Sequence, residues 1–383
     1  MDASPRGQPR SQPAPTPQRI LMLALLPIGD TLFLTPTIRA LRARYPAAHL
    51  AALAFAAGAP VLDATPELDA VIRWPRGASL GALAGRLAGL RALRRMGFDT
   101  SVDCTSPWYK WISLAAGIPR RTYLKFDRLW WLLPASHTAW RATHATRLYY
   151  DCARELDLPP WDVVDQVPTL ALPPEARAAA EAFVRENAPD GARARPLIAI
   201  HPGGTGLAGH KRWPAERFAA VADALAARHD ARVVLLGGPD EMALADAVAA
   251  RMRAAPLLAA GKLPLLATGA LIARCALFVG NDSSLLHLAA ALGTSYVGIF
   301  GPTSPANFRP IPSRSGQGRL VLPDPPCARL EYFVGGRPIW QTMRGADASA
   351  CLAGISVARV LAAADAAMEG GRMVAGQGQP TDL

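Results

Sequence analysis

The stretch Phe278-Val-Gly-Asn-Asp-Ser-Ser-Leu-Leu-His287, continued by Leu-Ala-Ala-Ala-Leu-Gly293, decides the fold. It predicts an apolar strand that stops at Gly280 and a helix that begins at two serines. The first N–H groups of a helix lack backbone partners, so such a terminus favours a phosphate or another anion. Four polar side chains lie at this junction: Asp282, Ser283, Ser284 and His287. A capped helix with a core histidine is the alternative, because Ser and Asp are common caps.

The same strand–turn–helix unit recurs along the chain. The expected strands are residues 19–26, 49–54, 70–73, 100–104, 196–201, 232–236, 277–279 and 296–300. The expected helices are residues 35–45, 80–96, 174–187, 215–228, 241–252, 265–275, 284–292 and 355–369. This alternation is typical of doubly wound parallel sheets, so we predict an α/β protein.

The chain has 383 residues, more than a single hydrophobic core usually serves, and two domains are expected. The predicted parts are a disordered tail (1–18), an N-terminal Rossmann-like domain (19–170), a C-terminal Rossmann-like domain (171–354) whose residues 171–195 form the linker region, a C-terminal helix (355–369) and a loose tail (370–383). Two such domains face each other across a cleft, with ligands at the carboxyl ends of their strands.

Positive charge is the main compositional feature. The net charge is +11, and the N-terminal half holds two basic clusters: Arg86, Arg91, Arg94 and Arg95, then Arg120, Arg121, Lys125 and Arg128. They suggest an anionic partner such as nucleic acid, a membrane surface or an acidic glycolipid, although such runs are usually solvated faces. The absence of a recognised reader motif argues against nucleic acid.

Cysteine usage and hydropathy bear on location. The five cysteines are dispersed without CxxC spacing, which favours reduced thiols in a cytoplasmic protein and argues against a zinc site. The longest apolar runs, residues 20–28 and 50–57, are too short to cross a bilayer. We therefore expect a cytoplasmic protein whose membrane association, if any, is peripheral.

The first loop of interest follows the first strand. Gly29 would allow close backbone approach, and Asp30 places a carboxylate at the mouth of the cleft. A carboxylate there suits a general base. Helix capping is the alternative, but Thr35-Pro36 already supplies a helix start.

Two further loops suit a nucleotide. In His201-Pro-Gly-Gly-Thr-Gly-Leu-Ala-Gly-His-Lys-Arg-Trp-Pro214, glycines could fold around a phosphate while Thr205 and Lys211 contact it. GxxxxGK[ST] is missing from this loop, which argues against a P-loop, and GxGxxG is missing after the first strand, which argues against a nicotinamide-dependent oxidoreductase. Glu241 could accept hydrogen bonds from ribose hydroxyls, or simply favour the first turn of a helix.

Together these motifs resemble glycosyltransferase family nine, the ADP-heptose:lipopolysaccharide heptosyltransferases. The resemblance runs from about Arg19 to Val360. It rests on Gly29-Asp30 with Thr35-Pro36 and Leu41-Arg42, Pro202-Gly203 with Lys211-Arg-Trp-Pro214, Gly237-Gly-Pro-Asp-Glu241, Gly280-Asn-Asp282 with His287-Leu-Ala-Ala-Ala-Leu-Gly293, and Phe300-Gly-Pro-Thr303.

The resemblance implies a GT-B fold with the acceptor on the N-terminal domain and the nucleotide sugar on the C-terminal domain. It implies inverting transfer of a heptose to the lipopolysaccharide inner core without a metal or other cofactor, at the inner face of the inner membrane. By the family pattern Asp30 matches the catalytic aspartate, Lys211 a diphosphate contact, Glu241 a nucleoside contact and Asp282 the donor-sugar aspartate. Gly29, Arg120 and Arg121 are assigned to the acceptor side.

One departure affects the donor. The family usually carries Asp-Thr-Gly where this chain has Asp282-Ser283-Ser284. A serine in place of glycine adds a side chain where the backbone would approach the donor. A GT-B enzyme with another nucleotide sugar or acceptor, or a non-catalytic relative that binds the nucleotide sugar, therefore remains an alternative.

Overall fold

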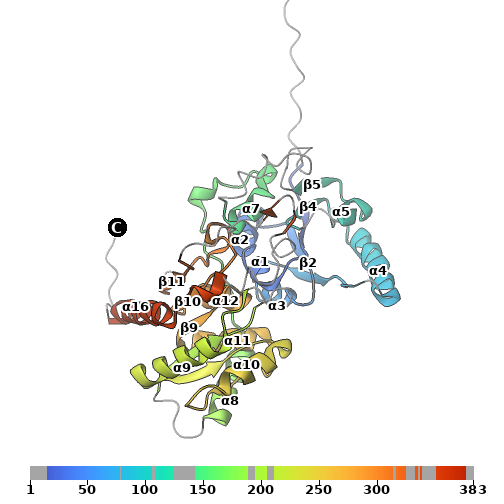
Figure 1. Ribbon diagram of the computed structural model, residues 1–383. Coiled ribbons are helices and arrows are strands. Elements are labelled where there is room, and N and C mark those ends of the chain that lie inside the picture. Colours follow the sequence, from blue (N-terminus) through green and yellow to red (C-terminus); the bar gives the residue numbers. More distant parts are fainter. Residues whose placement is uncertain are drawn as a thin grey trace, which may run out of the picture.

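The computed structural model describes residues 15–77, 79–105, 109, 111–123, 143–188, 195–204, 211–313, 316–324, 333–334, 337–338 and 351–376. Thr205, Lys125, Arg128 and, of the two expected tails, residues 1–14 and 377–383 lie outside the described residues. The chain forms two parallel sheets, one from each half, which lie one above the other in Figure 1.

The N-terminal sheet has the strand order β3-β2-β1-β4-β5. Its strands are β1 (Arg19–Ala24), β2 (His49–Ala54), β3 (Ala70–Arg73), β4 (Thr100–Asp103) and β5 (Arg120–Tyr123). Its helices are α1 (Ile28–Leu32), α2 (Thr35–Arg44), α3 (Ala59–Asp63), α4 (Leu80–Met96), α5 (Trp111–Ala115) and α7 (Ala145–Asp151). Side chains of β1 alternate between two cores: Ile20 and Met22 join the core with α2, and Leu21 and Leu23 join the core with α4 and α5.

The C-terminal sheet has the strand order β11-β10-β9-β6-β7-β8. Its strands are β6 (Leu197–His201), β7 (Arg232–Leu235), β8 (Leu257–Leu258), β9 (Cys275–Asn281), β10 (Tyr296–Ile299) and β11 (Gly318–Val321). One face carries α8 (Pro174–Asn187), α11 (Leu265–Ala273) and α12 (Ser284–Ala291). The other carries α9 (Ala215–His229), α10 (Met242–Ala249) and α16 (Val357–Gly376).

Short elements complete the described chain. They are the 3-10 helices η3 (Arg154–Leu156), η4 (Trp161–Val163) and η6 (Pro239–Glu241), the helix α13 (Pro305–Phe308), and an antiparallel pair of β12 (Phe333–Val334) and β13 (Arg337–Pro338).

Two expectations about helices need correction. The residues around Gly29-Asp30 form the short helix α1 rather than an irregular turn. Pro27 is the extended residue that precedes this helix, and the negative charge of Asp30 in the first turn stabilises the helix N-terminus. The last helix continues to Gly376 instead of ending at residue 369. Its glycines cost only about 1 kcal/mol each relative to alanine, which weakens a helix without ending it.

The thiol expectation holds only in part. Cys104, Cys152 and Cys275 are free and buried. Cys351 is disulfide-bonded, because the fold can bring together cysteines that are far apart in sequence. No helix in the described part of the chain is long and apolar enough to cross a membrane.

The two halves meet through apolar helices. Leu32 of α1 and Val61 of α3 are fully buried in the same hydrophobic cluster as Leu285 and Leu288 of α12. This contact brings the carboxyl end of β1 next to the N-terminus of α12.

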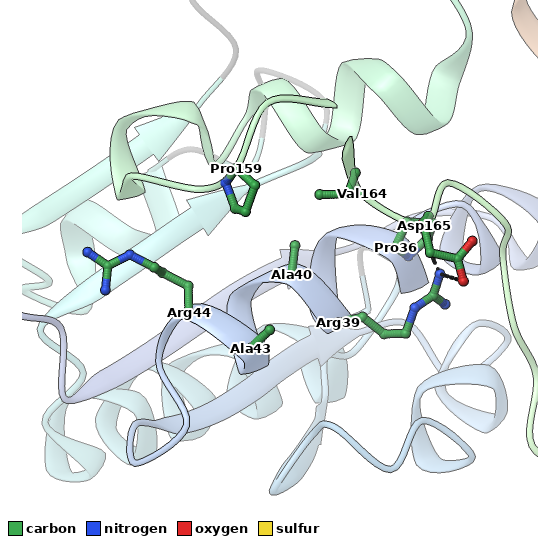
Figure 2. A pocket seen from close by; sticks show the side chains of 8 residues that line it. All are labelled: Pro36, Arg39, Ala40, Ala43, Arg44, Pro159, Val164 and Asp165. Atoms are coloured by element: carbon green, nitrogen blue, oxygen red, sulfur yellow. Dashed lines mark hydrogen bonds and ion pairs between the residues drawn. The ribbon is translucent and has the colours of Figure 1, made fainter. Parts of the chain in front are cut away.

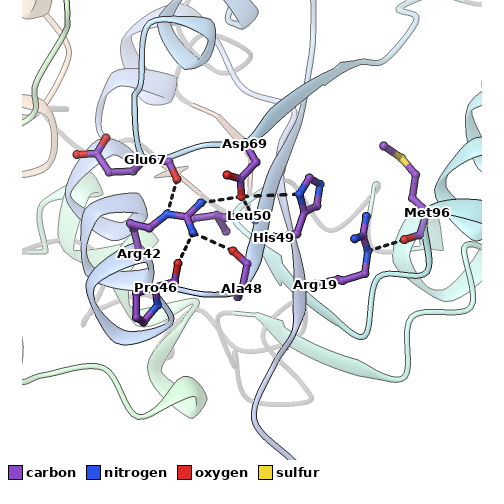
Figure 3. A network of polar contacts seen from close by, with 9 residues as sticks. All are labelled: Arg19, Arg42, Pro46, Ala48, His49, Leu50, Glu67, Asp69 and Met96. Atoms are coloured by element: carbon purple, nitrogen blue, oxygen red, sulfur yellow. Dashed lines mark hydrogen bonds and ion pairs between the residues drawn. The ribbon is translucent and has the colours of Figure 1, made fainter.

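Polar contacts stabilise the N-terminal half away from this junction. Arg42 donates hydrogen bonds to three carbonyl oxygens and to Asp69, at the amino ends of the strands (Figure 3). Figure 2 shows a groove between α2 and the segment after Pro159, where Arg39 contacts Asp165 at 3.5 Å. Its other lining residues are mainly small or apolar, so this groove lacks the chemistry of a catalytic site.

Candidate active site between the two halves

Asp30 lies in the first turn of α1, at the junction of the two halves. Tyr149 donates a hydrogen bond from its hydroxyl to Oδ1 of Asp30 at 2.7 Å. Burial raises the pKa of Asp30, Tyr149 and Lys211 lower it, Asp282 raises it, and the net shift is upward. A carboxyl group with a raised pKa is a better proton acceptor than an ordinary aspartate.

Tyr149 is a site residue that the sequence interpretation missed. It lies on α7, whose N-cap is His144: Nδ1 of His144 accepts from the backbone N–H of Thr146. The other ring nitrogen, Nε2, therefore carries the proton and donates to the carbonyl of Arg309 at 2.8 Å. Since Arg309 belongs to the C-terminal half, α7 is fixed by both halves.

Asp282 and Lys211 form an ion pair opposite Asp30. Nζ of Lys211 donates to Oδ2 of Asp282 at 2.7 Å, and the Asp282 side chain is almost completely buried. Burial raises the pKa of Asp282, but Lys211, His287 and Thr303 more than offset this and hold it below its usual value. The Lys211 and Asp282 charges both lie close enough to Asp30 to shift its pKa.

His287 packs directly against the N-terminal half. Burial lowers the pKa of His287 to about 4, so its ring is neutral at physiological pH. The ring meets Phe33 edge-on, with 4.7 Å between centroids. A Cβ on Gly29 would lie 3.1 Å from Cδ2 of His287, tighter than an ordinary contact. The missing side chain of Gly29 thus permits α1 to approach α12.

The N-terminus of α12 has no side-chain cap. Ser283 occupies the N-cap position, but its hydroxyl lies 3.0 Å from Nδ1 of His201 and makes no capping bond. The first N–H groups of α12, from Ser284 onward, are therefore available to an anion. This arrangement departs from the alternative of an ordinary capped helix.

His201 links Ser283 to Glu241, another feature that the sequence did not reveal. Oε2 of Glu241 lies 3.0 Å from Nε2 of His201. A carboxylate accepts only, so Nε2 of His201 carries a proton and donates to Glu241, while Nδ1 of the same ring contacts the Ser283 hydroxyl. Burial raises the pKa of Glu241, but His201 and the N–H groups of Gly238 and Gly204 lower it to about 2.

The Glu241 carboxylate is thus already hydrogen-bonded by the protein. It accepts from the backbone of Gly204 at 2.7 Å and Gly238 at 2.8 Å, besides His201. A Cβ on Gly203 would overlap this carboxylate. A carboxylate has about four lone-pair sites, so capacity for one ligand hydroxyl remains.

Asn281 holds the loops in place and was also missed. Its amide nitrogen donates to the carbonyls of Pro202 and Gly203, and its oxygen accepts from the backbone of Trp213. Trp213 is buried and lies two residues before α9, so this bond fixes the segment that leads into the helix.

The structure does not bring Arg120 and Arg121 to this site. They begin β5, so they lie at the amino edge of the N-terminal sheet, whereas Asp30 follows the carboxyl end of β1. Arg120 donates to the carbonyl of Glu155 and Arg121 to that of Ile118. The sequence showed a basic cluster but not at which end of the strand it would lie.

Comparison with known proteins identifies the family. Residues 86–332 match the sequence profile of glycosyltransferase family 9 (heptosyltransferase). The chain belongs to this family. Lipopolysaccharide heptosyltransferase 3 of Escherichia coli is 29% identical over 299 residues, which cover 74% of this chain and 83% of the relative. Lipopolysaccharide heptosyltransferase 2 of Escherichia coli K12 is 26% identical over 311 residues, covering 79% and 88%.

Solved structures show the same fold. A family 9 glycosyl transferase from Veillonella parvula matches with a TM-score of 0.75 and 22% identity, over 92% of this chain and 97% of that one. Escherichia coli ADP-heptose lps heptosyltransferase II matches with a TM-score of 0.71 and 24% identity, over 93% and 100%. These structures confirm the expected GT-B fold, and the family match confirms the expected enzyme class, a glycosyltransferase. Among the described residues of this family 9 enzyme, no group of three or more His, Cys, Asp or Glu is placed to hold a metal ion.

Proposed function

We propose that this glycosyltransferase moves a heptose from ADP-heptose to the inner core of lipopolysaccharide, with inversion and without a metal ion. The observation that carries the proposal is that Asp30 of one half faces the Lys211–Asp282 pair of the other. The names of the curated relatives support the reaction. A structure described as Escherichia coli heptosyltransferase WaaC with ADP, with a TM-score of 0.57, supports the nucleotide.

In the proposed reaction Asp30 is the general base. Its carboxylate takes the proton of an acceptor hydroxyl, and that oxygen attacks the anomeric carbon from the side opposite the diphosphate. The bond from the anomeric carbon to the diphosphate oxygen breaks, and its electron pair leaves with ADP. A single displacement inverts the anomeric centre.

Negative charge builds on the leaving diphosphate. Lys211, held by Asp282, and the uncapped N–H groups at the start of α12 supply fixed positive charge for it. The Ser284 hydroxyl and Thr205 would add hydrogen bonds, and His287 would border the donor sugar. The Ser283 hydroxyl, held 3.0 Å from Nδ1 of His201, would also contact the donor.

The proposal divides labour between the halves. The N-terminal domain, residues 19–170, would hold the acceptor, an anionic glycolipid presented at the cytoplasmic face of the inner membrane. The C-terminal domain, residues 171–354, would hold the nucleotide sugar, with Glu241 at a ribose hydroxyl. The serine at position 284 keeps a second candidate open, a GT-B transferase with a different nucleotide sugar, because its side chain stands where the family has glycine.

The test is a transfer reaction. Purified protein is incubated with ADP-heptose and defined inner-core acceptors, with and without EDTA, and products are identified by mass spectrometry. We expect a product heavier by one heptose in both conditions, formed about 10²–10⁴-fold more slowly with Asp30→Asn. Transfer only from another nucleotide sugar would establish the second candidate, and a requirement for added metal would overturn the metal-independent mechanism.

A further inference from the structure

The helix α4 presents leucines to solvent. Leu80 is 86% exposed, Leu83 53% and Leu87 49%. They recur at intervals of three and four residues, so they share one side of the helix. Exposed leucines at this spacing form an apolar stripe, unlike the scattered single residues found on most surfaces.

Packing against the domain explains why the leucines point outward. The inner side of α4 uses glycine: a Cβ on Gly89 would lie 2.9 Å from Trp74 and one on Gly85 3.0 Å from Pro75. These glycines let the helix backbone press against Trp74. Leu80, Leu83 and Leu87 lie on the outer side, where the domain does not bury them, whereas Leu90 and Leu93 pack into the core.

Helix α5 extends this surface. Arg94 of α4 donates to the carbonyl of Ala115 at the end of α5, and Trp111 of α5 packs edge-on against Trp74. Trp111 and Leu114 are themselves 44% and 63% exposed. Figure 1 shows α4 and α5 side by side at the periphery of the N-terminal half, away from the C-terminal sheet.

The charge of this surface has one sign. Residues 74–98 and 104–123 contain no aspartate or glutamate. Arg91 and Arg95 are exposed on the last two turns of α4, beyond the leucine stripe. An apolar stripe beside arginines is the pattern of a helix that lies in the interface of an anionic bilayer, with leucines among the acyl chains and guanidinium groups at phosphates.

The position of the stripe relates it to the active site. Helix α4 follows the carboxyl end of β3, so Leu80 and Leu83 at its start lie toward the sheet edge that also carries Asp30. We propose that the exposed face of α4 and α5 docks this enzyme onto an anionic lipid surface, with the site turned toward acceptors anchored there. The link to the acceptor rests on the proposed function; the docking itself does not.

Vesicle sedimentation of the full chain tests the docking. Phosphatidylcholine vesicles with about a third of phosphatidylglycerol should bind the protein, and pure phosphatidylcholine vesicles should bind it much less. Raising the salt from about 0.1 M to about 1 M should weaken binding, because the Debye length falls from about 10 Å to about 3 Å. Absence of binding to the anionic vesicles would overturn the proposal.

Two sets of variants locate the surface. Leu80→Ser, Leu83→Ser and Leu87→Ser combined should lower the partition coefficient about tenfold or more. Arg91→Gln with Arg95→Gln should lower it about thirtyfold, from roughly 1 kcal/mol per basic residue. The matched controls are Val163→Ser with Met242→Ser, whose side chains are 68% and 46% exposed elsewhere, and Arg251→Gln with Arg253→Gln. Equal losses in the controls and the α4 variants would refute a docking role for α4.

Activity separates this proposal from the proposed function. The leucine variant should transfer sugar normally to an acceptor dispersed in detergent and poorly to the same acceptor in anionic vesicles. If the wild type transfers to neither, the proposed function fails, while vesicle binding still decides the docking. Normal transfer by the leucine variant to the vesicle-bound acceptor would overturn the docking proposal alone.

Discussion

The Tyr149 hydroxyl donates a 2.7 Å hydrogen bond to Oδ1 of Asp30. The two residues come from α7 and α1, and α7 is itself anchored to the C-terminal half by the bond from His144 to Arg309. The protonation of Asp30 therefore depends on contacts from both halves. An acceptor hydroxyl near Asp30 would meet a carboxylate whose position is already fixed.

Replacing Tyr149 should alter the pH dependence of the reaction. The Tyr149 hydrogen bond lowers the pKa of Asp30, so Tyr149→Phe should raise that pKa and move the acidic limb of kcat/KM to higher pH. At neutral pH we expect a loss of about tenfold, the worth of a hydrogen bond to a charged group. A pH–rate profile measures both effects, and an unmoved limb would show that Asp30 is not the group titrating.

Asp30→Asn should separate catalysis from stability. Loss of the base should reduce kcat by about 10²–10⁴-fold, with donor binding retained. Because the folded-state pKa of Asp30 is raised, ionising it costs the native state stability as pH rises through that window. Asn removes the cost, so Tm at pH 7–8 should be unchanged or higher, and near pH 3 the difference should vanish. Thermal melts across pH and single-turnover rates test this; a large drop in Tm would point to a structural role.

Lys211→Met should weaken donor binding and also leave the buried negative charge of Asp282 without its ion-pair partner. Asp282 would keep an unpaired carboxylate, at a cost of about 3 kcal/mol. Adding Asp282→Asn should restore most of the stability without restoring donor affinity. Calorimetric titration with ADP and thermal melts of the single and double variants provide the comparison. Recovery of ADP affinity in the double variant would mean that Lys211 serves only to neutralise Asp282.

Glu241→Gln should destabilise the protein in a pH-dependent way. The pKa of Glu241 is about 2 in the folded state against an ordinary 4.5. The ionised Glu241 contributes on the order of 3 kcal/mol to the free energy of unfolding. This contribution is complete above about pH 4.5 and is lost as pH falls toward 2. The difference in Tm between the variant and the wild type should therefore be largest at pH 6–7 and shrink below pH 4. A constant difference would exclude the ionised carboxylate as its source.

His144→Asn should flatten the response of stability to acid. Burial lowers the pKa of His144 to about 4. The contribution of the neutral ring to the free energy of unfolding is therefore complete above about pH 6.5 and is lost as pH falls toward 4. Asparagine keeps the cap of α7 but neither titrates nor reaches Arg309. We expect a slightly lower Tm at pH 7.5 and about 2 kcal/mol less loss between pH 6.5 and 4. His144→Ala, which also removes the cap, is the comparison; an acid response identical to the wild type would contradict the assignment.

Much of the fold could be predicted from local patterns. The bounds of β2, β3, α4 and α8 were predicted to the residue. Continuous apolar runs between turn residues mark buried parallel strands whatever lies beside them. The short helix α1 escaped prediction because five residues with glycine at the second position show no helical period.

The candidate site could be predicted where its residues follow the end of a strand. Asp30, Glu241 and Asp282 each come shortly after an apolar strand, and the change from apolar to polar residues marks them. Tyr149 and His201 carry no such mark. Tyr149 becomes a neighbour of Asp30 through the packing of α7, and His201 reaches Ser283 and Glu241 because β6 pairs with β9 while the loop after β7 folds back.

The sequence by itself determined the two βα series, the position of the Asp30 carboxylate after the first strand and the anion-favouring start of α12. Each of these depends on residues that are adjacent in the chain. The tertiary structure alone decided that Asp30 faces Lys211, that Ser283 turns to His201 instead of capping α12, and that the first leucines of α4, Leu80, Leu83 and Leu87, face outward. These outcomes depend on which surfaces meet when the sheets and helices pack, and strand order and helix orientation are set by contacts between distant residues.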